Sequence, residues 1–457
     1  MNNLKILFAA SEAAPIAKVG GLADVIGALP KALAKLNLDI RVIIPFYGAI
    51  DRSQYLIKLV KQNITVGTET VNLWQTNLPD SAVPVYLVEH RLFKGKEIYG
   101  DSRDVKKFIF FSRALLESAK AIDFAPDVIH LNDWHTAIVP ELLKTNPFFS
   151  RAKTLLTIHN LASQGIIGSK NLLADGILNA NLINTVSPTY AREILTKEFG
   201  AGLEKILIKR RRQLYGILNG IDTNYYNPQT DKLIAYNYRA ATLKNKTLNK
   251  LALQKQLGWP AAEKIALVSL VSRLVWQKGL ELIIPLLGGA GVGQAQFVFL
   301  GTGEKKYEDQ LKQLAKKFPK QISAQIKFDE TLAHQVYAGS DIFLAPSRFE
   351  PCGLTQLIAM RYGAVPLVRA TGGLADTVAP LQKGGRGVST GFTFKDFAAL
   401  AFHKTLAKAL DFYCNHPAGW RQLQANGMKG DFSWHKSARQ YLRLYQKLTN
   451  PEIFAKM

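Results

Sequence analysis

Cysteine is scarce in this sequence, and long apolar runs are missing from it. The 457 residues include two cysteines, Cys352 and Cys414, which cannot build a disulfide framework, so we expect a reducing compartment, the cytoplasm. No uninterrupted apolar stretch is long enough to span a bilayer, and we expect no membrane partner. The short apolar run near the start leads directly into a glycine motif, which indicates a buried strand rather than a signal peptide.

Acidic residues are few relative to basic ones. The chain holds 58 Lys and Arg against 35 Asp and Glu, a formal net charge of +23. Such a charge attracts anions, from nucleic acids to nucleotide diphosphates. The basic residues are scattered, and the sequence has no zinc spacing, RNA-binding aromatic motif or helix-turn-helix signature. We therefore interpret the charge as a solvated, lysine-rich surface and expect no nucleic-acid partner.

Apolar runs of strand length alternate with helical patterns through both halves. Short, nearly continuous, β-branched runs between helices are typical of parallel sheets covered on both faces. Because 457 residues are too many for one typical core, each half is predicted to form its own doubly wound α/β domain. The predicted strands are 5–9, 40–45, 83–88, 128–131, 154–158 and 182–186 in the first half, and 265–271, 297–300, 325–328, 342–345 and 364–368 in the second.

The boundary between the domains is predicted between residues 228 and 262, where a polar stretch follows Asn227-Pro228. We assign residues 1–240 to the first domain and residues 241–432 to the second. The amphipathic stretch that follows, about 433–457, is expected to pack back on the first domain as a helix. In open α/β sheets, ligands bind outside the carboxyl ends of the strands. Two such domains facing each other would hold a site in the cleft between them.

The most informative segment is Ser347–Gln356, which lies between a predicted strand and a predicted helix. It places Glu350 after the strand, and Gly353, Leu354 and Thr355 at the start of the helix. Unpaired backbone amides at a helix start suit an anion such as a diphosphate, and a nearby carboxylate accepts hydrogen bonds from sugar hydroxyls. The segment therefore indicates a nucleotide-sugar site. The alternative is an ordinary strand–turn–helix with a surface Glu.

A glycine motif at Lys18–Val25 follows the first predicted strand. Its Gly20-Gly21 pair would let the backbone approach a ligand closely, and Lys18 adds a cation for a phosphate, although no P-loop spacing follows. The string Gly-Gly-Leu-Ala-Asp recurs at 372–376, which favours equivalent loops at one site. The alternative for each motif is a tight strand-to-helix turn.

Four further polar residues follow predicted strands. Asp133 and His159 come at neighbouring strand ends, and Arg273 and Lys278 follow the first strand of the second half. Acid and imidazole groups at neighbouring strand ends favour a site over helix capping or a structural role, the alternatives for each residue alone. Arg and Lys together would neutralise a departing diphosphate without a metal. No His-x-x-x-His or Glu-x-x-His spacing supports a metal site.

These motifs together resemble those of bacterial glycogen synthases and plant starch synthases, in order and spacing over nearly the whole chain. The resemblance extends to Asp133-Trp134-His135, His159-Asn160 and the segments 185–191 and 216–222. It implies a GT-B fold, in which two Rossmann-like domains face a deep interdomain cleft. It also implies ADP-glucose as the donor, a growing α-1,4-glucan as the acceptor, retention of configuration, and no cofactor or metal.

Matching the motifs residue by residue carries the family's site onto this chain. The implied catalytic residues are Asp133, His159, Arg273, Lys278 and Glu350. The implied donor-binding residues are Lys18, Gly20, Gly21, Asp24, Asn219, Cys352, Gly353, Leu354 and Thr355. The implied acceptor-binding residues are Tyr99 and Asp101. In this assignment Asp133 and His159 flank the transferred glucose. Arg273 and Lys278 bind the diphosphate, and Glu350 holds glucose hydroxyls.

The chain departs from the family pattern in places. Ser163 stands where a Tyr is common, and the segment between 164 and 185 is short, which affects the acceptor side. Ile358 replaces a second acid of related retaining enzymes; bacterial glycogen synthases also lack that acid, which favours this branch. Two alternatives stay open: another retaining GT-B glucosyltransferase with a UDP-glucose donor, and a basic glucan- or RNA-binding protein without transfer activity. The sequence predicts no particular oligomeric state.

Overall fold

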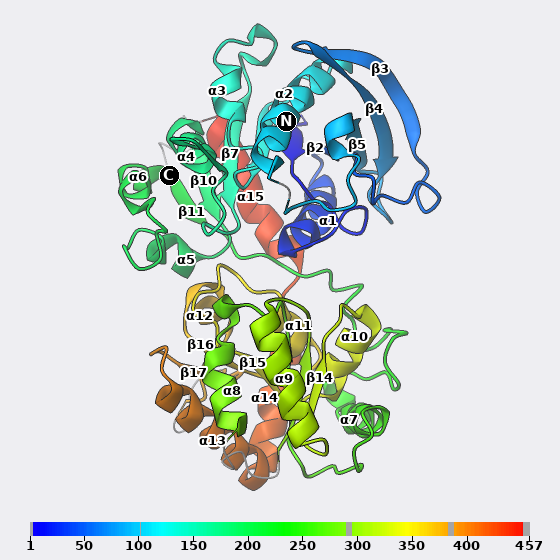
Figure 1. Cartoon of the computed structure of the whole chain (residues 1–457), viewed down its shortest axis with the longest axis vertical. Coiled ribbons are helices and arrows are strands. Elements are labelled where there is room, and N and C mark those ends of the chain that lie inside the picture. Colours follow the sequence, from blue (N-terminus) through cyan, green and yellow to red (C-terminus); the bar gives the residue numbers. More distant parts are fainter. Residues whose placement is uncertain (1–2, 101, 289–294, 383–387, 451–457) are drawn as a thin grey trace. The chain divides into compact units, whose positions relative to one another are not determined.

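The chain forms two compact units in the computed structural model, which describes residues 3–100, 102–288, 295–382 and 388–450 (Figure 1). The first unit comprises Met1–Gly220 and Trp434–Met457, and the second comprises Ile221–Ser433. No helix among the described residues combines the length and the apolar character that crossing a membrane requires.

The first unit contains a nine-stranded sheet in the order β11-β10-β7-β6-β1-β2-β5-β4-β3. The strands from β11 to β5 run parallel, and β4 and β3 are antiparallel additions at one edge. Their bounds are β1 Lys5–Ala9, β2 Asp39–Pro45, β3 Lys58–Val66, β4 Glu69–Asn77, β5 Pro84–Glu89, β6 Val128–Asn132, β7 Lys153–Ile158, β10 Leu182–Thr185 and β11 Leu214–Gly216; β8 Ile166–Ile167 and β9 Lys170–Asn171 pair separately.

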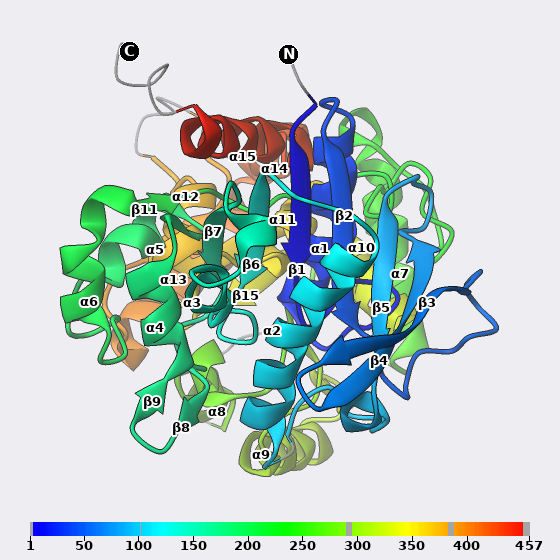
Figure 2. The ribbon, with the colours of Figure 1, turned by 90° about the horizontal axis from the view of Figure 1, so that it is seen from above.

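Helices cover this sheet, and one of them comes from far along the chain. α15, Trp434–Thr449, packs against α1 and contacts β6 and β7 (Figure 2). The Tyr445 hydroxyl lies 2.8 Å from Nδ1 of buried His130, and Asn184 donates to the Tyr441 hydroxyl at 2.9 Å. These polar contacts fix the register of α15 inside an apolar core. The other helices of the unit are α1 Gly21–Ala34, α2 Asp104–Ala121, α3 Val139–Leu143, α4 Leu172–Asn179, α5 Pro188–Glu193 and α6 Glu204–Lys209, with short η1 Arg91–Phe93, η2 Pro147–Phe149 and η3 Arg211–Gln213.

The second unit contains a parallel six-stranded sheet in the order β14-β13-β12-β15-β16-β17. Both units therefore have the predicted α/β class. The strands are β12 Leu267–Val271, β13 Gln296–Leu300, β14 Ile322–Gln325, β15 Ile342–Ala345, β16 Val365–Arg369 and β17 Phe392–Phe394. The helices are α7 Lys244–Gln256, α8 Leu280–Gly288, α9 Lys305–Lys317, α10 Glu330–Gly339, α11 Thr355–Arg361, α12 Gly372–Thr377, α13 Ala399–Asn415 and α14 Pro417–Lys429, with short η4 Ala240–Thr242 and η5 Trp276–Lys278.

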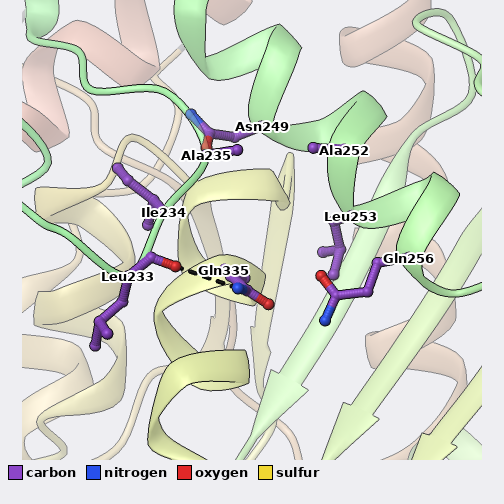
Figure 3. A pocket seen from close by; sticks show the side chains of 8 residues that line it. All are labelled: Leu233, Ile234, Ala235, Asn249, Ala252, Leu253, Gln256 and Gln335. Atoms are coloured by element: carbon purple, nitrogen blue, oxygen red, sulfur yellow. Dashed lines mark hydrogen bonds between the residues drawn. The ribbon is translucent and has the colours of Figure 1, made fainter.

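The segment 221–240, which the sequence assigned to the first domain, lies in the second unit. The Asp231 carboxylate accepts hydrogen bonds from the Tyr362 hydroxyl at 2.6 Å and is paired with His334 Nδ1 at 2.7 Å. Gln335 also donates to the Leu233 carbonyl, beside a cavity of about 180 Å³ that the segment shares with α7 and α10 (Figure 3). Tertiary hydrogen bonds thus attach this polar segment to the second unit, although the sequence placed the domain boundary after it.

One strand prediction is wrong, and one hairpin was not predicted. The expected strand 325–328 is displaced, because Ile322 packs into the core and Phe328 is 80% exposed. The sequence also missed the β3–β4 hairpin, whose outer strand is largely exposed and lacks a clear apolar alternation. Figure 1 shows this hairpin at the edge of the sheet beyond β5.

Candidate active site

Polar residues gather where three neighbouring parallel strands of the first unit end. β1, β6 and β7 are adjacent, so the residues that follow them meet at one edge of the sheet. Ser11 and Glu12 follow β1, Asn132 and Asp133 stand at the end of β6, and His159 follows β7. The structure thus brings together Asp133 and His159, as predicted, and adds Glu12, which the sequence interpretation missed.

Asp133 is held in an unusual conformation and a poorly solvated environment. Its φ of 54° lies in the left-handed region, which an L-residue adopts at some energetic cost. Oδ1 accepts hydrogen bonds from the backbone amides of His159 at 2.7 Å and Asn160 at 3.4 Å. Burial, assisted by the nearby charge of Glu12, raises the pKa of Asp133 to about 7. Such a perturbation is typical of functional carboxylates.

His159 is a neutral ring at the same edge. Its Nε2 lies 3.0 Å from Oδ1 of Asn132, whose amide group donates to the backbone carbonyl of Ala9. Since that amide orientation leaves Oδ1 as the acceptor, Nε2 carries the proton and Nδ1 is an acceptor. Desolvation lowers the pKa of His159 to about 3. The ring can therefore exchange a hydrogen bond with a sugar hydroxyl without carrying charge.

The glycine motif of the first unit wraps around Glu12. Oε2 of Glu12 accepts hydrogen bonds from the amides of Val19 at 2.6 Å and Gly20 at 2.8 Å, immediately before α1 begins at Gly21. Lys18 pairs with Asp24 at 2.7 Å, and both side chains are partly exposed. The four predicted donor residues of this motif, Lys18, Gly20, Gly21 and Asp24, thus lie on one loop and the first turn of a helix.

Tyr99, predicted to bind the acceptor, lies at the same edge. Its hydroxyl donates to Oε1 of Glu12 at 2.5 Å and lies 2.7 Å from the Ser11 hydroxyl oxygen. Burial and the charge of Glu12 raise the pKa of Tyr99, so the phenol stays protonated. Asp101, its predicted companion, lies outside the described residues. Asn219 follows β11; it is buried, and its Oδ1 has no hydrogen-bond partner within the described chain.

In the second unit, the structure joins two predicted catalytic residues directly. Lys278, at the end of η5, pairs with Oε2 of Glu350 at 2.6 Å, and the Ser347 hydroxyl donates to the same oxygen at 3.0 Å. Glu350 is 8% exposed, and no hydrogen bond or ion pair from the described residues goes to its Oε1. Gln277 ties the two segments together through its contact with the Phe349 carbonyl. The carboxylate is therefore anchored on one side, and its other oxygen is available to a ligand.

Arg273 is not part of this pair. Its side chain is exposed and makes no hydrogen bond or ion pair with the residues that the structure describes. Within the described ranges, no group of three or more His, Cys, Asp or Glu side chains gathers closely enough to hold a metal ion.

The backbone after Glu350 turns tightly into α11. Cys352 is buried and forms no disulfide, Gly353 has a φ of 74°, and Leu354 precedes the first residue of the helix, Thr355. The second Gly-Gly pair packs against this turn: the amide of Gly373 donates to the Glu350 carbonyl at 3.0 Å. A Cβ on Gly373 would lie 2.2 Å from the Cys352 carbonyl oxygen, so only glycine fits. The repeated glycine string therefore has a packing role here.

Two doubly wound α/β units, each with polar side chains at the carboxyl ends of its strands, define a class of protein. The model of the starch synthase catalytic domain matches residues 5–209, in the first unit. The model of glycosyl transferases group 1 matches residues 250–422, in the second unit. The protein is a glycosyltransferase with the GT-B fold, as the sequence predicted.

Relatives matched over their full length define the family. A glycogen synthase of Thermosipho melanesiensis is 42% identical over 98% of this chain and 100% of its own. Glycogen synthase 2 of Geobacter sulfurreducens is 44% identical over 97% of this chain and 98% of its own. The chain belongs to the glycogen synthase family, which confirms the resemblance that its motifs carry.

Solved structures agree with this assignment. The catalytic domain of starch synthase IV from Arabidopsis thaliana, bound to ADP and acarbose, is 33% identical, with a TM-score of 0.91 over 98% of this chain and 100% of that one. Sucrose-phosphate synthase from Thermosynechococcus elongatus covers 100% of both chains with a TM-score of 0.64. At 19% identity, that second likeness shows the fold alone.

Proposed function

We propose that this protein transfers glucose from ADP-glucose to the non-reducing end of an α-1,4-glucan, with retention of configuration. The observation that carries the proposal is the anchored Glu350, whose Oε2 is held by Lys278 and Ser347 beside the turn into α11. This arrangement places a carboxylate oxygen for sugar hydroxyls beside a cation for phosphate in the second unit. The related starch synthase IV domain, solved with ADP and acarbose, supports a nucleotide and a carbohydrate as ligands.

The donor diphosphate is proposed to bind at the second unit. Lys278 and the exposed guanidinium of Arg273 supply positive charge. The amides of Gly353, Leu354 and Thr355 lie where α11 starts, and such amides have no intrahelical acceptor. As the glycosidic bond to the phosphate breaks, negative charge grows on the leaving diphosphate. Fixed donors of this kind stabilise that charge without a metal or other cofactor.

The transferred glucose is proposed to contact the edge of the first unit. Asp133 offers a carboxyl group and His159 a neutral ring, both fixed by hydrogen bonds to the strand ends. Tyr99 and Asp101 are assigned to the acceptor. The acceptor's 4-hydroxyl attacks the anomeric carbon on the face from which ADP leaves, so the new bond keeps the configuration of the old one. The two cysteines, which form no disulfide, and this nucleotide donor fit a cytoplasmic reaction.

Glycogen and radiolabelled donor sugar test the proposal. We expect label from ADP-glucose to enter the polymer, and little label from UDP-glucose. Lys278→Ala and Glu350→Gln should each lower transfer by about a hundredfold to a thousandfold, because each removes a fixed contact to the reacting groups. Lys327→Ala, which removes an exposed ion pair of the same unit, is the matched control and should keep wild-type transfer.

Three results would contradict parts of the proposal. Equal incorporation from UDP-glucose would reject the donor assignment. No incorporation from either donor by a folded protein would reject the glucan acceptor. Near-normal turnover of both variants would reject the roles given to Lys278 and Glu350.

A further inference from the structure

Glu12 is a buried carboxylate that none of the motifs used for the family assignment contains. It follows β1 and is 3% exposed. Oε2 accepts two consecutive backbone amides, Val19 at 2.6 Å and Gly20 at 2.8 Å, and Oε1 accepts the Tyr99 hydroxyl at 2.5 Å. No Lys or Arg pairs with Glu12 in the described part of the chain. A buried charge is costly unless hydrogen bonds satisfy it, so these three donors stabilise the carboxylate.

The loop that Glu12 holds has few other contacts. Val19 is 55% exposed, so packing does not fix the loop. Gly20 has open space around it: a Cβ there would meet only Oε1 of Glu12, at 4.0 Å. The backbone before the loop is fixed separately, by a pair of hydrogen bonds between Ala13 and Ala17. Elsewhere in the loop, Lys18 pairs with Asp24 and the Gly20 carbonyl accepts from the Ala23 amide at 3.2 Å. The Glu12 carboxylate is the group that holds the two backbone amides of Val19 and Gly20.

Tyr99 connects the same carboxylate to a second part of the unit. Tyr99 lies between β5 and α2 along the chain, and its ring is tilted against that of His135, with 5.1 Å between ring centroids. Its hydroxyl bridges Ser11 and Glu12. A displacement of Tyr99 would remove one of the three donors from Glu12. The remaining two bonds, to the loop amides, would then change in strength and geometry.

We propose that Glu12 is a positioning residue that couples donor binding to acceptor binding, through the loop at residues 18–20 on one side and Tyr99 on the other. The inference rests on the proposed function, because that function assigns the loop to the donor and Tyr99 to the acceptor. One carboxylate shared by both makes the two binding events energetically dependent. By linkage, an acceptor that fixes Tyr99 changes the affinity for the donor nucleotide, and the reverse holds by the same factor.

The ADP dissociation constant, measured by titration calorimetry with and without saturating maltoheptaose, reports this coupling. In the wild type we expect maltoheptaose to change the ADP dissociation constant by about fivefold or more. In Tyr99→Phe and Glu12→Ala, the ratio of the ADP dissociation constants without and with maltoheptaose should be close to one. Glu12→Gln keeps an oxygen acceptor for the loop amides, so it should retain more ADP affinity than Glu12→Ala. Hydrogen exchange of the Val19 and Gly20 amides should quicken in Glu12→Ala.

Tyr47→Phe is the matched control, since its buried hydroxyl donates to the Ser11 carbonyl at 2.8 Å and makes no hydrogen bond to Glu12. It should keep the wild-type ratio even where it lowers thermal stability. The proposed coupling would be overturned if maltoheptaose left the ADP dissociation constant of the wild type unchanged. It would also be overturned if both Tyr99→Phe and Glu12→Ala kept the wild-type ratio of dissociation constants. In either case, glucosyl transfer by the wild type would leave the proposed function standing. A folded wild type that binds no ADP would instead reject the proposed function, and the inference with it.

Discussion

Because of Asp133, we expect the free energy of unfolding to depend on pH in an unusual way. The carboxyl group is 8% exposed, accepts two backbone amides and pairs with no cation among the described residues. Its pKa is raised from 3.8 to about 7, with burial as the main cause. Below pH 3.8 both the folded and the unfolded chain hold the proton, and the group has no effect. As the pH rises from 3.8 to 7, the unfolded chain ionises first, so folding stability falls.

The magnitude follows from that difference in pKa. Each pKa unit corresponds to about 1.4 kcal/mol, so the ionised, buried Asp133 lowers the unfolding free energy by about 4 kcal/mol at pH 8. Asp133→Asn keeps an oxygen for the same two amides and removes the charge. We therefore expect the variant to match the wild type at acid pH, to be more stable by about 4 kcal/mol at pH 8, and to lose transfer.

Urea unfolding followed by tryptophan fluorescence, at several pH values, measures the effect. Asp329→Asn is the control with opposite sign, because the hydrogen bonds from Lys327 and the Leu332 amide lower the pKa of Asp329. That charge stabilises the fold above pH 3.8, so its removal should cost stability at pH 8. If Asp133→Asn were no more stable than the wild type at pH 8, buried ionised Asp133 would not destabilise the fold. The same would follow if the unfolding free energies of variant and wild type differed by the same amount at every pH. An Asp133→Asn variant that is more stable than the wild type but inactive would show that the active site lowers the stability of the fold.

Two further predictions concern the second unit. Lys250 pairs with Asp341 at 2.7 Å in a buried setting, so Lys250→Met should lower the unfolding free energy by about 3–5 kcal/mol, whereas Lys327→Met, at an exposed pair, should cost about 0–1 kcal/mol. Equal urea midpoints for the two variants would contradict this. Gly373→Ala should lower the melting temperature, because its Cβ would overlap the backbone oxygen of Cys352; Gly20→Ala has room and serves as the comparison. An equal melting temperature for both would mean that the turn relaxes freely.

The sequence predicted the parallel core of both sheets because buried strands are short, apolar and β-branched. The β1, β6, β7 and β15 segments are of this kind, and every one lies where the pattern placed it or within a residue. The β3–β4 hairpin escaped prediction because its outer strand is mostly exposed, so no burial pattern marks it. Similarly, residues 221–240 were assigned to the first domain, because the partners that bind Asp231 lie more than a hundred residues away in the chain.

The sequence predicted most of the residues that form the site, but not which of them contact one another. Asp133 and His159 were found because polar residues directly after buried strands meet at one sheet edge. Glu12 carries the same signal after β1, but nothing in the sequence shows that the amides of the following glycine motif fold back onto its carboxylate. The pairing of Lys278 with Glu350, and the raised pKa of Asp133, depend on burial and on contacts across long stretches of sequence. Such contacts leave no mark in a local pattern.

The placement of α15 has a consequence for how the protein is made. The core of the first unit contains residues 434–449, yet the whole second unit lies between them and the rest of that core. On the ribosome, His130 of β6 must therefore wait for Tyr445, 315 residues later in the chain, and Asn184 of β10 for Tyr441, 257 residues later. A nascent chain interrupted within the second unit would carry an unfinished first unit, with a strip of uncovered core that chaperones and proteases can recognise.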